Sequence, residues 1–410
     1  MHGIGAALRV RNYRLYVSGG LVSLIGTWMQ RIGVGWLMWQ MTESGTWLGL
    51  AAMADLMPGV VVGPVAGVLA DRLDRLRTIR LAQVLMLIQG LALWACTAAG
   101  LMTPGLLLLL VLFGGVVVGV NQPARLALIP SLVPRALLAT AVAVNAVTFN
   151  LARFIGPALA GFVILNLDVA TVFLLNGLSF TAFIVTLSLM QLPPQEAGPT
   201  RRQSIVADIV QGLRYTAGHP GIGPILALMT VLSLGARPFV ELMPGLVDAV
   251  FGSGADGLAA LSSIVGLGAI CSGLWMASRG ARPGLARVTL GATALAAASI
   301  GALALSPGLG VAMVCAACAG VAMVICGVGT QTLLQMSVAG EVRGRVLSLY
   351  GIIFRSGPAA GAFVMGLASE FVGLRWPLAI GAGIAFLMWA WLWRRRGAIA
   401  AALEGDQSSP

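Results

Sequence analysis

Apolar runs of about 20 residues, the length that crosses roughly 30 Å of hydrocarbon as a helix, recur along this chain. Short stretches rich in Gly, Pro or charge separate the runs, as expected of loops. The pattern predicts twelve transmembrane helices, six on each side of a polar stretch at 193–220. The predicted spans are 14–41, 46–70, 81–101, 105–122, 137–165, 169–191, 221–250, 258–277, 287–305, 309–334, 346–370 and 376–393.

Composition supports a membrane protein and argues against other classes. Apolar residues make up 58% of the 410 residues and charged residues 10%, whereas a soluble domain is about 25% charged. Disordered chains are polar and charge-rich. No phosphate-binding loop is present, and only two histidines occur, His2 and His219. We therefore expect no enzyme activity, no cofactor and no metal site. The five cysteines lie in apolar runs and are interpreted as packing residues.

The basic residues indicate how the chain is oriented. All 25 are Arg, and the formal net charge is +11. With the N-terminus inside, 20 of the 25 Arg residues fall on the inner side of the predicted spans. Cytoplasmic loops collect positive charge, so this excess is explained without a nucleic-acid partner. Both termini are expected to be cytoplasmic.

The predicted organisation has four parts. They are an N-terminal six-helix bundle at 1–192, a cytoplasmic linker at 193–220, a C-terminal six-helix bundle at 221–396 and a cytoplasmic tail at 397–410. Within the linker, Ile205, Ile209 and Leu213 have helical spacing. This pattern predicts a short amphipathic helix, which either lies on the inner membrane face or joins the two bundles as a strap. The strap is preferred.

The two halves resemble each other. Arg153 precedes Gly156-Pro157 in the fifth span, and Arg355 precedes Gly357-Pro358 in the eleventh. Parallel repeats of six helices are one known plan for transporters. The sequence therefore predicts two pseudo-symmetric bundles. Proline bends a helix and glycine permits close helix approach, so Arg153, Pro157, Arg355 and Pro358 are interpreted as packing and gating positions.

The second loop carries the segment Gly67-Val-Leu-Ala-Asp71-Arg72-Leu-Asp74-Arg75. This segment resembles motif A of the major facilitator superfamily, G-x-L-a-D-R-x-x-R. Asp74 departs from the motif, since many members have Gly there. Further stretches are similar to the enterobactin-exporter-like branch: Asn12–Tyr16, Gly26–Gln30, Gln122–Arg125, Arg237–Pro244, Ala281–Leu285 and Arg343–Val346.

The resemblance implies the twelve-helix major facilitator fold and a carrier that works by alternating access about a midplane site. The branch includes exporters of siderophores and hydrophobic drugs, which use the proton gradient. The motif implies gating roles for Gly67, Asp71, Arg72 and Arg75. Two departures stand out. The loop at 279–287 is a degenerate copy of motif A without its Asp, and the fourth span lacks the Arg of many proton-coupled exporters.

Charged residues inside the predicted spans point to function, because each costs at least about 2.5–3.5 kcal/mol at mid-bilayer. Two polar stripes lie on the first and seventh spans, which are counterparts in the repeat. We predict that both stripes bind substrate, although Arg237 and Glu241 also have the i, i+4 spacing of a structural salt bridge. The stripes comprise Thr27, Gln30 and Arg31, and Ser233, Arg237 and Glu241.

Asp55 and Glu241 are the candidates for proton coupling. A carboxylate in a low-dielectric setting has a raised proton affinity, and Asp55 is the acidic residue deep in the second span. The alternative for Asp55 is a fixed ion pair with Arg31.

These observations lead to one function and two alternatives. The leading hypothesis is proton-coupled export of a small amphiphilic molecule, by antiport, across the bacterial inner membrane. We expect a monomer surrounded by lipid. One alternative is a lipid or lysolipid transporter, and the other is a membrane scaffold or sensor without transport.

Overall fold

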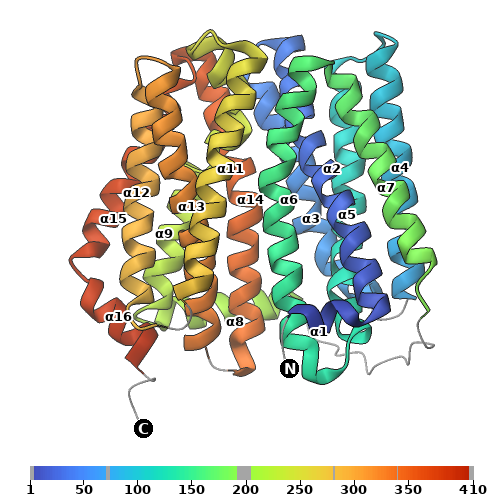
Figure 1. Cartoon of the computed structure of the whole chain (residues 1–410). Coiled ribbons are helices and arrows are strands. Elements are labelled where there is room, and N and C mark those ends of the chain that lie inside the picture. Colours follow the sequence, from blue (N-terminus) through green and yellow to red (C-terminus); the bar gives the residue numbers. More distant parts are fainter. Residues whose placement is uncertain (1–3, 71–73, 192–204, 280–281, 339, 406–410) are drawn as a thin grey trace. The chain divides into compact units, whose positions relative to one another are not determined.

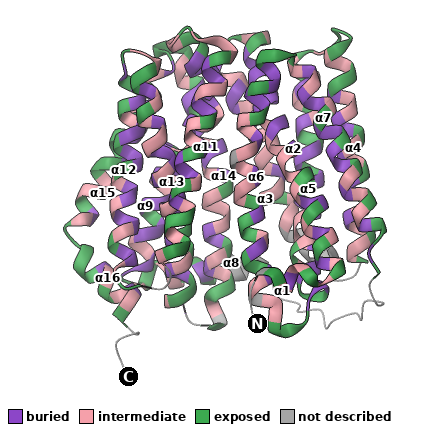
Figure 2. Ribbon diagram, viewed as in Figure 1, coloured by how far each residue is buried: buried purple, intermediate pink, exposed green. Residues whose placement is uncertain are grey.

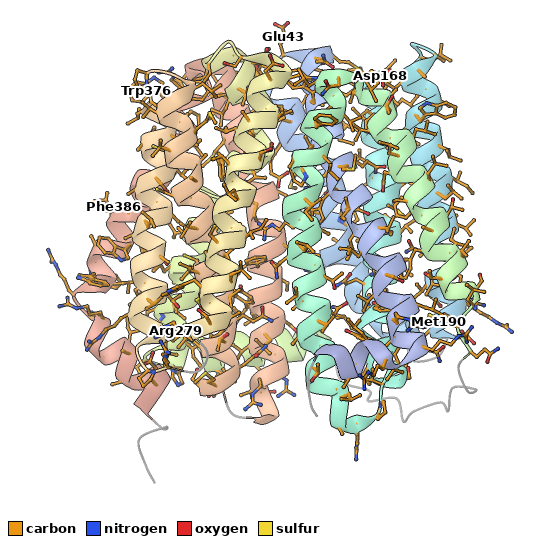
Figure 3. All side chains as sticks on the ribbon, viewed as in Figure 1. Glu43, Asp168, Met190, Arg279, Trp376 and Phe386 are labelled. Carbon is orange, nitrogen blue, oxygen red and sulfur yellow. The ribbon has the colours of Figure 1, made fainter. Side chains whose placement is uncertain are left out.

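The computed structural model describes residues 4–70, 74–191, 205–279, 282–338 and 340–405 (Figure 1). Over these ranges the regular structure is helical, and no strand occurs among them. The all-α class is therefore confirmed. Most helices carry both buried and exposed residues (Figure 2). Large apolar side chains such as Leu274 and Phe386 are exposed, as expected of surfaces that face lipid, and Phe386 projects from its helix in Figure 3.

The chain divides into two compact units, residues Met1–Thr42 with Ala54–Arg201, and residues Glu43–Met53 with Arg202–Pro410. The helices up to the linker are α1 (Ile4–Arg9), α2 (Arg11–Thr42), α3 (Gly45–Ala70), α4 (Arg75–Ala98), α5 (Pro104–Leu132), the 3-10 turn η1 (Arg135–Leu137), α6 (Leu138–Asn166) and α7 (Val169–Ser188).

The remaining helices belong to the second unit. They are α8 (Ile205–Gly218), α9 (Ile222–Gly235), α10 (Phe239–Gly245), the π turn η2 (Leu246–Val250), α11 (Gly254–Arg279), α12 (Leu285–Leu305), α13 (Leu309–Ser337), α14 (Gly340–Val372), α15 (Arg375–Trp393) and α16 (Arg396–Glu404).

Eleven spans within the described residues are long and apolar enough to cross a membrane, counting Ile222–Val250 as one. The remaining predicted span, 14–41, corresponds to α2, which is long enough at 32 residues. Its apolar run is interrupted by Gln30 and Arg31, so its hydropathy is lower than that of the others. The multi-pass helical membrane fold is therefore as the sequence predicts.

The two Gly-Pro segments occupy equivalent places in the two units. On α6, a Cβ at Gly156 would lie 2.8 Å from the Ile25 carbonyl oxygen of α2. On α14, a Cβ at Gly357 would lie 2.8 Å from Cβ of Ser233 on α9. In each unit glycine therefore lets a Pro-containing helix approach a neighbouring helix of that unit closely, as small residues do at membrane helix interfaces.

The N-terminal end of α3 belongs to the second unit, whereas the predicted boundaries place it in the first bundle. Glu370 on α14 accepts hydrogen bonds from the Ser44 hydroxyl at 2.5 Å and from the Thr46 amide and hydroxyl at 3.2 and 3.0 Å. Gly49 lies against the backbone of Phe363. These polar contacts join residues more than 300 positions apart, which no local pattern indicates.

The seventh predicted span, 221–250, is not one continuous α-helix. It consists of α9, α10 and η2, with a break at Ala236–Pro238. Proline lacks the amide hydrogen that continues a helix, and Pro238 immediately precedes α10. Of the two prolines in this span, Pro238 lies at the break and Pro244 lies inside α10.

Candidate functional site

An ion pair lies inside the first unit. Arg31 on α2 and Asp55 on α3 approach to 3.4 Å between Nε and Oδ2. Their side chains are 22% and 36% exposed, so the pair is not sealed in a dry core. Asp55 lies ten residues into α3 and Arg31 lies at least ten residues from either end of α2. The contact named as the alternative for Asp55 is therefore present.

Two guanidinium groups, one of them that of Arg31, lie close to the same indole ring. Cζ of Arg31 is 5.2 Å from the ring centroid of Trp28, and Cζ of Arg153 is 5.7 Å from the same ring. Trp28 also meets Phe149 edge to face, with the centroids 5.9 Å apart. Guanidinium groups at these distances are attracted by the negative face of an aromatic ring. The structure thus brings Arg31, Asp55 and Arg153 together around one aromatic residue.

Gln30 belongs to a buried amide network. It is 8% exposed, donates to Oε1 of Gln89 on α4 at 3.2 Å, and accepts from Nδ2 of Asn176 on α7 at 2.7 Å. Gln89 also donates to the Leu110 carbonyl of α5 at 3.2 Å. The predicted substrate contact of Gln30 thus lies in a helix-packing network. Thr27 donates to the Ser23 carbonyl of its own helix at 2.8 Å.

The second unit places its polar stripe around the break before α10. Arg237 lies in the break, and its Cζ is 3.8 Å from the ring centroid of Phe354 on α14. Glu241 lies in the first turn of α10. Ser233 is 1% exposed and donates to the Ile353 carbonyl at 2.8 Å. The stripe therefore meets α14 at the residues that precede its Gly-Pro segment.

The predicted gating residues fall into two groups. Asp71 and Arg72 lie outside the described residues, and Gly67 lies in the last turn of α3. Arg75 donates to the Ala127 carbonyl of α5 at 3.1 Å, and so ties the start of α4 to α5.

The two interior prolines and the remaining interior Arg are also placed. Pro157 lies inside α6 and Pro358 inside α14. Arg355 lies on α14 with an exposed side chain. Their gating roles stay predictions.

Asp74, the departure from motif A, has a local function. Its carboxylate accepts from the Arg77 amide at 2.8 Å and caps α4, with φ −61° and ψ 113°. An acidic residue immediately before a helix is a typical N-cap. The backbone at this position has negative φ, so no glycine is needed there.

Three polar residues of the first unit were not among the predicted site residues, although Arg125 ends a stretch that resembles the exporter branch. Gln89 and Asn176 could have been found as lone amides in apolar runs, since such residues favour contacts between membrane helices. The Arg125 guanidinium lies over the rings of Tyr16 and Phe183, at 5.7 and 5.0 Å. Its sequence signal is a charged residue seven positions before the end of α5.

Within the described part of the chain, no three His, Cys, Asp or Glu side chains are grouped so that they could hold a metal ion.

A family model described as transmembrane secretion effector, of the major facilitator superfamily, matches residues 4–406. The enterobactin exporter of Shigella boydii serotype 4 is 32% identical over 255 residues, covering 60% of this chain and 59% of that protein. The staphyloferrin A transporter of Staphylococcus aureus is 23% identical over 245 residues, covering 58% and 60%. The matched segments thus span less than two thirds of these relatives.

Solved structures resemble the chain over nearly its whole length. A bacterial homolog of the human lysosomal transporter Spinster has a TM-score of 0.69 at 14% identity, covering 98% of this chain and 99% of that one. A nucleoside transporter has a TM-score of 0.68 at 12% identity, covering 97% and 100%. At these identities the likeness concerns the fold alone.

Proposed function

The chain belongs to the transmembrane secretion effector family of the major facilitator superfamily, and from this premise we propose that it is a proton-coupled exporter. The family establishes a multi-pass membrane protein, and a small-molecule substrate is part of the proposal. The proposal adds that a small amphiphilic molecule leaves the cytoplasm across the bacterial inner membrane by alternating access, in exchange for protons. Both termini lie on the cytoplasmic side.

The Arg31–Asp55 pair carries this proposal. Its two opposite charges lie 3.4 Å apart and remain partly exposed. Protonation of Asp55 removes the attraction and leaves the Arg31 charge without that neutraliser. Because α2 and α3 each supply one partner, the protonated and deprotonated forms favour different contacts between these helices. A carboxylate that changes the balance between two helix arrangements is a means of coupling protons to movement.

Exchange of cargo for protons follows if the binding of cargo weakens the binding of the proton to Asp55. When cargo binding lowers the proton affinity of Asp55, proton binding lowers the cargo affinity by the same factor, because linkage is reciprocal. A proton that arrives from outside then releases the cargo there. The return of the empty carrier delivers the proton to the cytoplasm.

The surroundings of the pair suit an amphiphile. Trp28 and Phe149 offer aromatic surface beside the charged groups. Two relatives are named for the export of enterobactin and the transport of staphyloferrin A. Siderophores are therefore the first cargo to test, followed by hydrophobic drugs.

The test uses the full chain in proteoliposomes that enclose a pH-sensitive dye. A pH gradient is imposed, and siderophores, hydrophobic drugs and lysolipids are added in turn. We expect one cargo class to accelerate proton flux in the wild type and not in Asp55→Asn. The matched control is Asp168→Asn, since Asp168 caps α7 by accepting from the Thr171 amide at 2.6 Å and asparagine also caps helices well.

Two results would contradict the proposal. Cargo-stimulated proton flux that survives in Asp55→Asn would remove the coupling role of this residue. Stimulation by lysolipids alone would favour the lipid-transport alternative. The direction of transport is measured in cells that lack the gene for this protein. Accumulation of the cargo inside these cells supports export, whereas its depletion indicates uptake.

A further inference from the structure

The C-terminal segment forms a helix that packs onto the second unit. Helix α16 buries Ile399 and Leu403, which are 1% and 3% exposed. Both side chains join a core cluster with residues of α9, α12 and α13, among them Ile222 and Leu285. A solvated segment would not bury apolar residues in this way, so part of the predicted cytoplasmic tail at 397–410 is folded. The segment up to Glu404 is therefore part of the folded unit.

Helix α12 begins without a capping side chain of its own. Its N-cap is Gly284, in the left-handed region at φ +85°, where glycine is favoured. The loop sequence at 279–287 contains no Asp or Glu. The first amides of a helix have no partner inside the helix, so the start of α12 needs an acceptor from elsewhere.

Glu404, the last residue of α16, supplies that acceptor. One carboxylate oxygen accepts from the Gly284 amide at 2.9 Å, and the other accepts from the Ala286 amide at 2.5 Å. The negative charge also lies at the positive end of the α12 dipole, where anions are stabilised. The carboxylate thus binds the loop through two backbone donors, 118 and 120 residues earlier in the chain.

The opposite side of the same turn is held by Arg279. Its guanidinium donates to the carbonyls of Arg282 at 2.9 Å and Pro283 at 2.6 Å. Arg279 lies at the lower end of the second unit in Figure 3, the same end at which Figure 1 shows α16. Arg279 therefore donates to the carbonyls of this turn, and Glu404 accepts from its amides.

The counterpart helix in the first unit is capped differently. Asp74 caps α4 from the residue immediately before it, whereas the corresponding loop of the second unit lacks an acid. We propose that Glu404 is a positioning residue that replaces this missing acid, so that the C-terminal helix holds the start of α12, at Gly284–Ala286, in a fixed position. Helices α12 and α16 then move as one rigid body during transport, so that α16 takes part in the conformational change of the carrier.

The experiment is hydrogen exchange by mass spectrometry on the full-length protein in nanodiscs. In Glu404→Ala, we expect the Gly284 and Ala286 amides to exchange at least about tenfold faster, which corresponds to about 1.4 kcal/mol. Glu404→Gln keeps an acceptor and the side-chain size, so we expect a smaller increase in the exchange rates of these amides. This variant also keeps the test decisive if Glu404→Ala does not fold. The control Asp74→Ala accelerates the Arg77 amide and leaves Gly284 and Ala286 unchanged.

A transport assay distinguishes a positioning role of Glu404 from a contribution to stability alone. If cargo-driven proton flux is found for the wild type, we expect Glu404→Gln to lower the maximal rate severalfold and to leave the half-saturating cargo concentration unchanged. Unchanged exchange at Gly284 and Ala286 in Glu404→Ala would overturn the inference, as would a wild-type maximal rate in Glu404→Gln. If the wild type moves no cargo, the proposed function fails, and the exchange result still decides the role of Glu404.

Discussion

Replacing Asn176 by alanine removes one link of the amide network in the first unit. Asn176 is fully buried and donates to Oε1 of Gln30 at 2.7 Å, while its own Oδ1 accepts from the Ser179 hydroxyl at 3.1 Å. Ser179 keeps its second bond, to the Asn176 backbone carbonyl at 2.7 Å. The substitution therefore leaves Oε1 of Gln30 without this donor.

The expected loss of stability follows from that single acceptor. An unsatisfied buried polar group costs about 1–3 kcal/mol in proteins generally. Hydrogen bonds between membrane helices average about 0.6 kcal/mol and reach about 1.7 kcal/mol, because the unfolded chain in a bilayer also finds partners. We therefore expect Asn176→Ala to lower the free energy of unfolding by about 1–2 kcal/mol.

A double-mutant cycle in nanodiscs measures the contact. The free energies of unfolding of Gln30→Ala, Asn176→Ala and the double variant are compared with that of the wild type. We expect a coupling energy of about 0.6–1.7 kcal/mol. The matched control is Asn150→Ala, because Asn150 is only partly buried and makes an exposed hydrogen bond to the Ala146 carbonyl of its own helix at 2.9 Å; we expect a change within about 0.5 kcal/mol.

Two outcomes would refute this reasoning. Strict additivity in the cycle would show that Gln30 and Asn176 contribute independently. Equal losses in Asn176→Ala and Asn150→Ala would show that burial of the amide does not set the cost.

Three further predictions concern local contacts. His219 accepts from the Gly221 and Ile222 amides at 3.2 Å each, and burial lowers the pKa of His219. The start of α9 should therefore be protected from hydrogen exchange above pH of about 6.5 and lose protection as the pH falls through the lowered value; His219→Asn should remove this pH dependence. Gly156→Val should lower stability by about 1–3 kcal/mol in thermal unfolding, because overpacking separates helices, whereas Gly105→Ala should not, since no atom lies within 4 Å of its Cβ position. Asp74→Ala should lower stability by about 1 kcal/mol through loss of the α4 cap, and Asp74→Asn should restore most of it.

Several features of the site could be predicted because their signals are local. The interior charges at Arg31, Asp55 and Arg237 are visible as single polar residues in apolar runs. The Gly-Pro segments are visible as repeated strings. The cap at Asp74 needs only the residue and the helix that follows it, although comparison with motif A indicates only a departure at this position.

Other features depend on the rotation of one helix against another. The 3.6-residue period separates Gln30 and Arg31 by about 100° around the axis of α2; Gln30 contacts α4 and α7, and Arg31 contacts α3. A helical wheel does not distinguish these two outcomes. Predicting both as substrate contacts therefore overlooked the network that occupies Gln30.

The apolar runs and the helical class can be predicted from the sequence, because each segment carries the length and hydropathy that the bilayer demands. The family resemblance rests on local motifs such as the segment from Gly67 to Arg75. The tertiary structure decided which polar groups meet. Asn176 reaches Gln30 across 146 positions and Glu404 reaches the start of α12 across 118. Such pairs depend on helix packing and register, which are set by the summed contacts of whole helices and not by any one stretch of residues.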